Sequence, residues 1–264
     1  MLLKECIYSL MIDYDTPNFK DVLTTRGTGK DDMIPVSNLV AAYKKVNDIH
    51  FSAQDYIRLC NIALFSSRTE QQIGIRDTQT FLQRAISNLK TYNLTTPEAI
   101  LPVLADISAY LYDCEDDPLV QAALVHYQFE MIHPFEKYNG IVRRILPFMI
   151  LQNSAGKALP TLCLSKCLYF NKNEYFDTLR TTQYSGSYAR WIKFFLRVIG
   201  KAVKNSVSQL QQYEESIKSD EEMIRFAITQ GKSLGTVYDY LKEFPIMGIA
   251  AAEKQTNLSY NFVL

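Results

Sequence analysis

Apolar residues recur at helical spacing along most of this 264-residue chain, and this pattern constrains the fold more than any other feature. Between Val36 and Val46, for example, the apolar side chains fall on one face of a helix. Few stretches alternate apolar and polar residues between hairpin turns. The sequence therefore predicts an all-α or nearly all-α fold. We expect short irregular or hairpin segments only near Gly74–Leu94.

Local start signals set the bounds of several expected helices. Ser52 is a plausible N-cap for a helix that continues to Leu64. Thr96-Pro97 and Asp117-Pro118 each combine an N-cap residue with proline at the first helical position. The helices that they open are expected to run to about Leu111 and Met131. Further helices are predicted near residues 138–151, 165–170, 174–181, 188–207, 221–230, 234–244 and 248–256, and one is predicted to begin at Tyr260.

Bulk composition excludes several classes of protein. The formal net charge is +0, so charge alone does not indicate a nucleic-acid-binding protein. No apolar run reaches the ~20 residues of a membrane helix, and the N-terminus lacks a signal-peptide pattern. Five scattered cysteines favour a reducing compartment. Cys163 and Cys167 form C-x-x-x-C without a nearby histidine pair, which favours buried thiols over zinc. We expect a cytoplasmic protein without a membrane partner or a resident metal.

A change in composition suggests how the chain is divided. Polar and charged residues crowd residues 209–220, and only short helical patterns follow. We predict a main domain over residues 1–207, whose first 35 residues form an N-terminal region. Residues 208–264 are expected to form a helical linker and a small C-terminal segment.

The candidate functional loop begins at His133. Pro134 disfavours the helical conformation in the residue before it, so a helix should end at His133. An unperturbed imidazole titrates near pH 6.5, which suits a general base at neutral pH. A histidine whose ring is satisfied by a backbone carbonyl at a helix end is the alternative interpretation.

An anion site is expected directly after this histidine. Asn139 and Gly140 tolerate left-handed backbone geometry, so their turn could present amides to an anion, as could the start of the next helix. Arg143 and Arg144 follow, although cations oppose the helix dipole there. Pairing with a phosphate or a carboxylate would explain them. A plain interhelical turn and simple surface exposure are the alternatives.

The stretch from His133 to Arg144 resembles the signature loop of the Fic (Fido) family, usually His-Pro-Phe-x-(Asp/Glu)-Gly-Asn-Gly-Arg-x-x-Arg. It keeps the histidine, proline, phenylalanine, Asn139-Gly140 and the last arginine. Flanking segments also resemble the family in the right order, over roughly residues 1–207. They are residues 118–130 before the loop, Gly74-Ile75-Arg76 before the substrate-aligning flap, and residues 173–179 and 191–196 after the loop.

The resemblance implies a mainly helical fold with a hairpin flap and a defined reaction. His133 would deprotonate a Ser, Thr or Tyr hydroxyl of a target protein, which attacks the α-phosphate of ATP and receives AMP. Asn139, Gly140, Arg143 and Arg144 would hold phosphates. Three departures weaken this expectation. Lys137 replaces the acid that holds Mg²⁺, Tyr138 replaces the first glycine, and Ile141 replaces the first arginine.

The N-terminal segment Ser9-Leu10-Met11-Ile12-Asp13-Tyr14 resembles the family's inhibitory helix, (Ser/Thr)-x-x-x-Glu-(Gly/Asn). There the glutamate pairs with the last arginine of the loop and blocks the γ-phosphate site. The resemblance implies that Asp13 pairs with Arg144. An ordinary helix end is the alternative, because Asp13 is one methylene shorter and Tyr14 replaces the small residue.

Three other segments resemble parts of nucleotide-binding or DNA-binding motifs. Residues 26–31 and Gly231-Lys232-Ser233 resemble fragments of a P-loop but lack its required spacing or residues, so we interpret them as loops. Residues 244–260 resemble the first part of a helix-turn-helix, and Fic proteins often carry a winged-helix module. A complete recognition helix is missing, so DNA binding is not expected of this chain.

These observations favour a Fic-family protein with weak or altered nucleotidyl transfer. ATP is the expected nucleotide, Mg²⁺ is doubtful, a protein hydroxyl is the expected acceptor, and a homodimer is an option. The first alternative is a catalytically inactive Fic-fold binding or regulatory protein. The second is a protein like a transcription regulator with an incomplete DNA-binding module.

Overall fold

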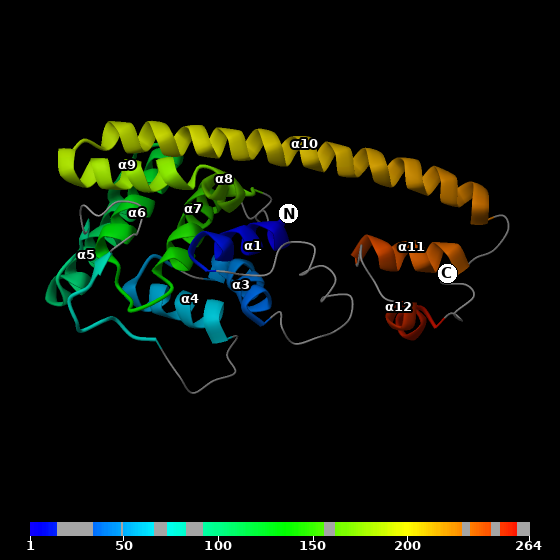
Figure 1. Ribbon diagram of the computed structural model, residues 1–264, viewed down its shortest axis with the longest axis horizontal. Helices are drawn as coiled ribbons and strands as arrows, with labels where there is room; N and C mark the ends of the chain where they lie inside the picture. The colour runs from blue at the N-terminus through cyan, green and yellow to red at the C-terminus, as the bar shows by residue number, and fades with distance from the viewer. Residues whose placement is uncertain are drawn as a thin grey trace. The chain divides into compact units, whose positions relative to one another are not determined.

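The computed structural model describes residues 1–14, 34–48, 50–65, 73–82, 92–155, 162–228, 233–243 and 249–257 (Figure 1). The chain divides into two compact units. Unit 1 comprises Met1–Asp15 and Pro35–Val203, and unit 2 comprises Thr16–Ile34 and Lys204–Leu264. The candidate loop and the N-terminal helix both belong to unit 1.

The described elements are almost all helices, which confirms the predicted fold class. Unit 1 contains α1 (Leu2–Asp13), α3 (Ile34–Lys44), the 3-10 helix η2 (Val46–Asp48), α4 (Ala53–Phe65), β1 (Phe81–Leu82), β2 (Tyr92–Asn93), α5 (Pro97–Asp113), α6 (Pro118–Ile132), α7 (Asn139–Ala155), α8 (Leu164–Phe170), α9 (Lys172–Ser185) and the start of α10 (Tyr188–Ile228). Unit 2 contains the rest of α10, α11 (Ser233–Glu243) and α12 (Ile249–Thr256).

Start signals in the sequence have the expected physical effect. The amide of Asp55 donates to Ser52 Oγ at 3.1 Å, so Ser52 caps α4. The amide of Leu119 donates to Asp117 Oδ1 at 2.8 Å, and Pro118 begins α6. Pro97 likewise begins α5, but the side chain of Thr96 does not cap that helix.

The core of unit 1 is built around α6 and α7, which make its most extensive helix pair. α5 packs on α6, α4 packs on α7, and α1 contacts both α7 and α8. The first turns of α10 bury Trp191, whose indole Nε1 donates to the carbonyl of Ala123 at 2.7 Å. The loop between α6 and α7 is therefore anchored by the best-packed helices of unit 1.

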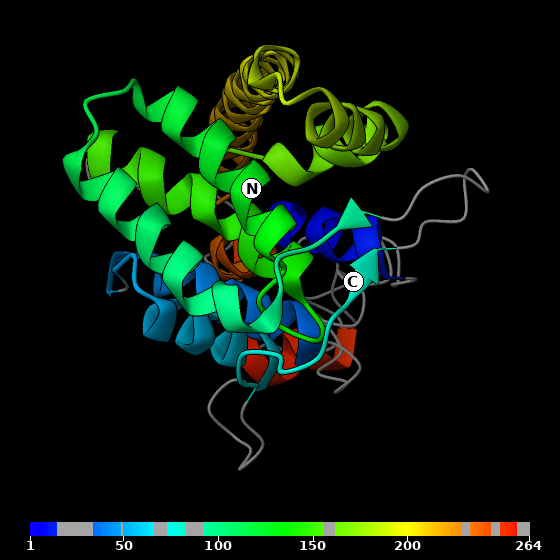
Figure 2. The ribbon, with the colours of Figure 1, turned by 90° about the vertical axis from the view of Figure 1, so that its left-hand side faces the viewer.

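A short hairpin lies where irregular or hairpin structure was expected. Phe81 pairs with Asn93 and Leu82 pairs with Tyr92 in an antiparallel arrangement (Figure 2). The connection between the strands lies outside the described residues. Because each strand has only two residues, the described part of the fold is still mainly α-helical.

The predicted end of the helix near Val207 and the separate helix at 221–230 are wrong. α10 is continuous from Tyr188 to Ile228. Residues 208–220 contain no glycine or proline and include three Gln, two Glu and one Lys, which favour helix. Lys218 and Glu214 also pair one turn apart, with Nζ and Oε1 at 2.8 Å. The predicted domain boundary at 207 falls inside this helix, close to Val203 and Lys204, where the chain divides into its two units.

Two other expectations are only partly covered by the structure. The helix expected from Tyr260 and the discarded P-loop-like segment at residues 26–31 lie outside the described residues, as does most of Gly231-Lys232-Ser233. None of the described helices combines the length and apolar character needed to cross a membrane.

Candidate functional site

The loop between α6 and α7 begins with a left-handed residue. His133 ends α6 with φ 47° and ψ 61°, and its amide still donates to the carbonyl of Phe129 at 2.9 Å. This conformation is uncommon for a residue with a Cβ. It turns the chain sharply at the residue before Pro134, so the imidazole lies at the junction of the helix and the loop.

Asn139 closes the loop by a reciprocal pair of hydrogen bonds. Its Oδ1 accepts from the amide of Phe135 at 2.9 Å, and its Nδ2 donates to the carbonyl of Phe135 at 2.7 Å. The Asn139 side chain is buried, as is the Phe135 ring. Asn139 therefore fixes the shape of the loop in this structure, rather than offering its side-chain amide to a ligand.

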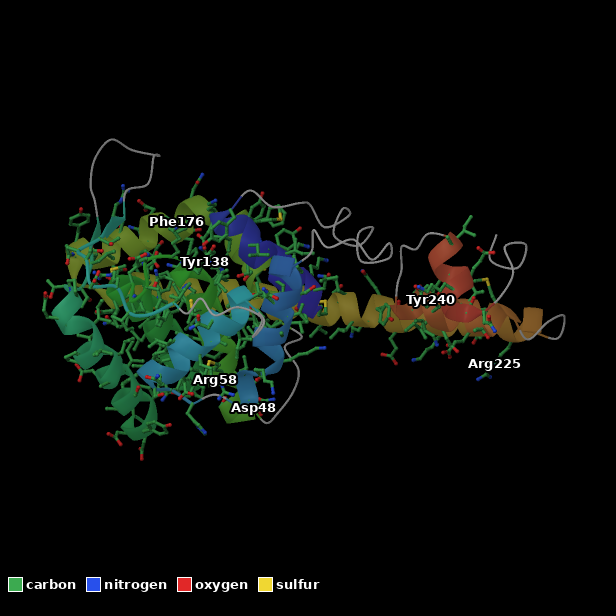
Figure 3. All side chains as sticks on the ribbon, turned by 90° about the horizontal axis from the view of Figure 1, so that it is seen from below. Asp48, Arg58, Tyr138, Phe176, Arg225 and Tyr240 are labelled. Atoms are coloured by element: carbon green, nitrogen blue, oxygen red, sulfur yellow. The ribbon has the colours of Figure 1, made fainter. Side chains whose placement is uncertain are left out.

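The left-handed geometry lies one residue earlier than expected. Tyr138, and not Asn139 or Gly140, has a positive φ of 68°. This is the position at which the family's loop has its first glycine, and glycine adopts such a conformation without a Cβ penalty. Tyr138 adopts it at a cost of roughly 1–2 kcal/mol. Its ring lies beside that of Tyr14, with centroids 5.6 Å apart. Figure 3 shows the side chains with Tyr138 labelled.

Arg76 ties the hairpin segment to the loop. Its Nε donates to the carbonyl of His133 at 2.8 Å, and its backbone amide donates to the carbonyl of Pro134 at 2.9 Å. The guanidinium also binds carbonyls of Thr78, Thr95 and Ile132. A cation at the C-terminal end of α6 is electrostatically favourable. Arg76 thus fixes the position of His133 from the side of the hairpin.

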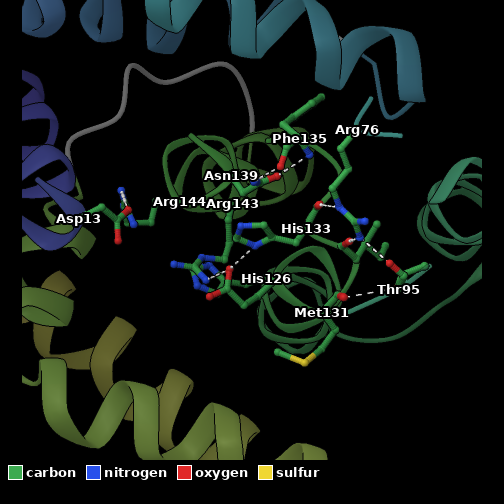
Figure 4. A network of polar contacts seen from close by, with 12 residues as sticks. Asp13, Arg76, Thr95, His126, Met131, His133, Phe135, Asn139, Arg143 and Arg144 are labelled. Carbon is green, nitrogen blue, oxygen red and sulfur yellow. Dashed lines mark hydrogen bonds and ion pairs between the residues drawn. The ribbon is translucent and has the colours of Figure 1, made fainter. Parts of the chain in front are cut away.

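A buried charged group lies beside the imidazole (Figure 4). His133 Nδ1 is 3.5 Å from Glu130 Oε2, and Arg143 Nη1 pairs with the same oxygen. Burial is the largest single effect and would raise the pKa of Glu130, but Arg143 and His133 together outweigh burial and hold the pKa at about 2. The guanidinium of Arg143 also lies over the ring of Tyr175, 5.4 Å from its centroid. In this arrangement a carboxylate binds Arg143, so simple surface exposure of this arginine is excluded.

Arg144 binds the N-terminal helix. Its Nε donates to Ser9 Oγ at 2.8 Å and its Nη2 donates to the carbonyl of Ser9 at 2.7 Å. The same Nη2 pairs with Asp13 Oδ2 at 2.8 Å. Arg144 is fully buried, and 15% of the Asp13 side chain is exposed. The pairing of Asp13 with Arg144 that the resemblance implies is therefore present, and it joins residues 131 positions apart in the sequence.

Gly140 makes this contact sterically feasible. Asp13 Oδ2 lies where a Cβ on Gly140 would have to be, and Arg144 Nη1 is 2.9 Å from that same point. The carboxylate therefore lies against the first turn of α7, where the positive end of the helix dipole favours an anion. Gly140, Arg144 and the start of α7 together form an anion site, which holds a carboxylate of the same chain.

A second buried carboxylate anchors α1. Glu5 accepts from the amide of Ser165 at 2.8 Å, from Ser165 Oγ, and from Tyr43 Oη at 3.1 Å. Glu5 is 0% exposed, and burial raises its pKa to about 7 against the lowering effect of these hydrogen bonds. Glu5, Ser9 and Asp13 are spaced by four residues, so one face of α1 carries all three polar contacts.

The substituted loop positions do not provide a metal site. Lys137 and Glu136 are exposed, and Ile141 is buried. The cation at Lys137 would repel Mg²⁺, which requires oxygen ligands. Among the described residues, no group of three His, Cys, Asp or Glu side chains is arranged to hold a metal. The residues present do not fit the magnesium that the family's loop binds, and we derive no step through it.

Sequence reasoning missed three residues of this site. Glu130 precedes His133 by three residues on α6, a spacing that puts both on one face and could have indicated contact. Glu5 precedes Ser9 by one helical turn, which is the same kind of signal. Arg76 was recognised only as part of a Gly-x-Arg segment, because four of its five carbonyl partners, all except Thr78, are remote in sequence.

Comparisons with known proteins show which family and fold the chain is similar to. Residues 50–151 match the model of the Fic/DOC family. Protein adenylyltransferase fic-1 of Caenorhabditis elegans is 26% identical over 153 residues, which is 57% of this chain and 26% of the relative. The Caenorhabditis briggsae protein of the same name is 26% identical over 148 residues, or 55% of this chain and 25% of the relative. The chain thus spans about a quarter of the length of these curated relatives.

Solved structures show the same fold. A Fic family protein from Desulfovibrio desulfuricans G20 superimposes with a TM-score of 0.69 at 21% identity, covering 79% of this chain and 65% of that one. Fic-1 of C. elegans superimposes with a TM-score of 0.61 at 20% identity, covering 83% and 64%. The matched family model and these structures lead to one conclusion: residues 50–151 match the Fic/DOC family, and the chain has the fold of solved Fic family proteins.

Proposed function

We propose that this chain transfers AMP from ATP to a protein hydroxyl at a site that α1 holds closed. One observation carries the proposal: the anion site formed by Gly140 and Arg144 already binds the carboxylate of Asp13. A site that holds one anion against a helix start and a buried guanidinium suits a phosphate group equally well. His133 follows the end of α6 in the same loop.

The proposed reaction uses His133 as the base. The imidazole accepts the proton of a Ser, Thr or Tyr hydroxyl as the hydroxyl oxygen bonds to the α-phosphorus of ATP. The bond from that phosphorus to the oxygen leading to the β-phosphate breaks, and pyrophosphate leaves. Arg144 and the amides at the start of α7 neutralise phosphate charge once Asp13 withdraws. Ile141 supplies no second guanidinium, so we expect weak transfer.

Arg143 has a different role from the phosphate binding predicted for it. Its guanidinium is buried against Glu130 and the face of Tyr175. Moving it to a phosphate would leave the carboxylate of Glu130 buried without its partner, which costs several kcal/mol. We therefore assign phosphate binding to Arg144 and the α7 amides, and a supporting role to Arg143.

A catalytically inactive Fic-fold binding protein is the second candidate. It is favoured by Ile141, which replaces an arginine and is buried in the core. It is also favoured by Lys137, which replaces the metal-binding acid. This candidate predicts that opening the site yields nucleotide binding without transfer.

Labelled ATP distinguishes the two candidates. Wild type, Asp13→Ala and Asp13→Ala/His133→Asn would be incubated with α-labelled ATP and a cell lysate, with magnesium or with a chelator. We expect AMP on Ser, Thr or Tyr, identified by mass spectrometry, to rise about tenfold or more in Asp13→Ala. The His133→Asn change should abolish it. Equal labelling by the single and double variants under both conditions would refute transfer by His133.

A further inference from the structure

The ion pair of Glu130 and Arg143 lies beside His133 but takes no direct part in the phosphate chemistry proposed above. Glu130 and Arg143 are both buried, at 5% and 1% exposure. A buried ion pair seldom adds net stability compared with apolar residues of the same volume. Its position next to the candidate base therefore calls for a chemical explanation.

The geometry restricts the protonation state of the imidazole. His133 Nδ1 faces Glu130 Oε2 at 3.5 Å. In a neutral imidazole one ring nitrogen carries a hydrogen and the other carries a lone pair. A lone pair on Nδ1 would face an anionic oxygen, whereas an N–H there faces a hydrogen-bond acceptor. Distances of this length are common at catalytic histidines before substrate binds.

Arg143 keeps the carboxylate in its charged form. Its Nη1 binds the same Oε2 that faces His133, so protonation of that oxygen is opposed by a buried cation. The other side of the histidine is held by Arg76, whose Nε donates to the His133 carbonyl and not to the ring. The nearby His126 does not add charge, because burial, together with Arg143 and Arg144, lowers its pKa well below the usual range.

We propose that Glu130 is a positioning residue that fixes His133 as the Nδ1–H tautomer, leaving Nε2 as the basic nitrogen, and that Arg143 holds Glu130 in place. This inference rests on the proposed function in naming Nε2 as the atom that accepts the proton of the hydroxyl. It also explains why an arginine lies at 143: its guanidinium is directed at the support of the base, not at the nucleotide.

The tautomer can be measured without substrate. The chain has three histidines, so a long-range ¹H–¹⁵N correlation spectrum of the labelled full chain gives few signals. The set of imidazole signals that is lost in His133→Asn belongs to His133, the candidate base. We expect neutral His133 to carry its hydrogen on Nδ1 in wild type and in Arg143→Lys, which keeps a cation beside Glu130. A wild-type ring protonated on Nε2 would overturn the proposal directly.

Removal of the carboxylate provides the second arm. Glu130→Met/Arg143→Met removes both charges together, so neither is left buried without a partner. We expect most of neutral His133 to move to the Nε2–H form in this variant, with backbone amide shifts showing that it folds. An unchanged tautomer in the folded variant would also overturn the proposal. If it does not fold, the wild-type spectrum alone still decides.

Kinetics separate this role from the transfer reaction itself. In the Asp13→Ala background, Glu130→Gln should lower kcat roughly 10²-fold or more with little change in KM for ATP, because a wrong tautomer affects the chemical step. Complete absence of transfer in Asp13→Ala would reject the proposed function but would not alter the expected spectrum. A raised KM with unchanged kcat would count against positioning.

Discussion

At the scale of single residues, the site depends on three buried charges whose partners can be named. Arg144 binds Ser9 and Asp13, whereas Arg143 binds Glu130. The resemblance of residues 9–14 to the family's inhibitory helix implied the contact between Asp13 and Arg144, with an ordinary helix end as the alternative. It could not separate the roles of the two adjacent arginines, because adjacent helical residues point about 100° apart and the sequence does not say which faces the core.

The pairing of Arg143 with Glu130 predicts that removing one partner lowers stability far more than removing both. Arg143→Met leaves a buried carboxylate without a cation, and we expect a loss of about 3–5 kcal/mol in the free energy of unfolding. Adding Glu130→Met should recover most of that loss. Urea denaturation of the two single variants and the double variant measures the coupling.

Arg190→Met is the matched control, because its pair with Asp177 is exposed at the surface. Loss of that pair should cost less than about 1 kcal/mol. The pH dependence has a defined sign. The pKa of Glu130 is lowered, so its contribution is present above about pH 4.5 and is lost as pH falls toward 2. An Arg143→Met loss no larger than the Arg190→Met loss would contradict the account.

At the scale of elements, α1 is the helix whose carboxylate occupies the anion site. It contacts α7 and α8, and its polar face carries Glu5, Ser9 and Asp13. The resemblance to the family's inhibitory helix indicated Ser9 and Asp13. Glu5 was not predicted, because its partners Tyr43 and Ser165 come from α3 and the start of α8, far away in the sequence. The continuity of α10 was not predicted, because residues 208–220 are mostly polar, although their helix propensity is high.

Glu5 predicts a pH-dependent attachment of α1. Its pKa is raised to about 7, so the stability that it contributes is full below about pH 4.5 and declines as pH rises through 7. Glu5→Gln imitates the protonated form and should not lose this contribution. We expect the unfolding free energy of Glu5→Gln relative to wild type to increase between pH 5 and 8, by on the order of 3 kcal/mol.

Chemical denaturation across that pH range gives the measurement. Glu214→Gln is the control, because the Glu214 carboxyl is exposed and pairs only with Lys218 at the surface. Its difference from wild type should change little over the same range. A flat difference for Glu5→Gln would show that the buried carboxyl does not bind a proton in the folded protein.

At the scale of the whole molecule, the fold was more predictable than the state of the site. Helical periodicity predicted the helices of unit 1 from α3 onward, whereas only the family resemblance implied α1. The Asp117-Pro118 start of α6 and its end at His133 were placed nearly correctly. The predicted winged-helix-like segment stays a prediction: α11 and α12 are helices, but the helix expected from Tyr260 lies outside the described residues. Closure of the site depends on packing α1 against α7, a long-range contact that periodicity cannot predict.

The central claim is that Asp13 occupies a phosphate site, and ATP binding to the full chain tests it most directly. Isothermal titration would compare wild type, Asp13→Ala, Asp13→Ala/Arg144→Ala and Asp48→Ala, the last removing an exposed acid at the surface. We predict that Asp13→Ala lowers the Kd for ATP about tenfold or more, which corresponds to about 1.4 kcal/mol. The added Arg144→Ala change should abolish the gain, and Asp48→Ala should match wild type. An Asp13→Ala Kd equal to that of wild type, or a gain that survives Arg144→Ala, would contradict the account.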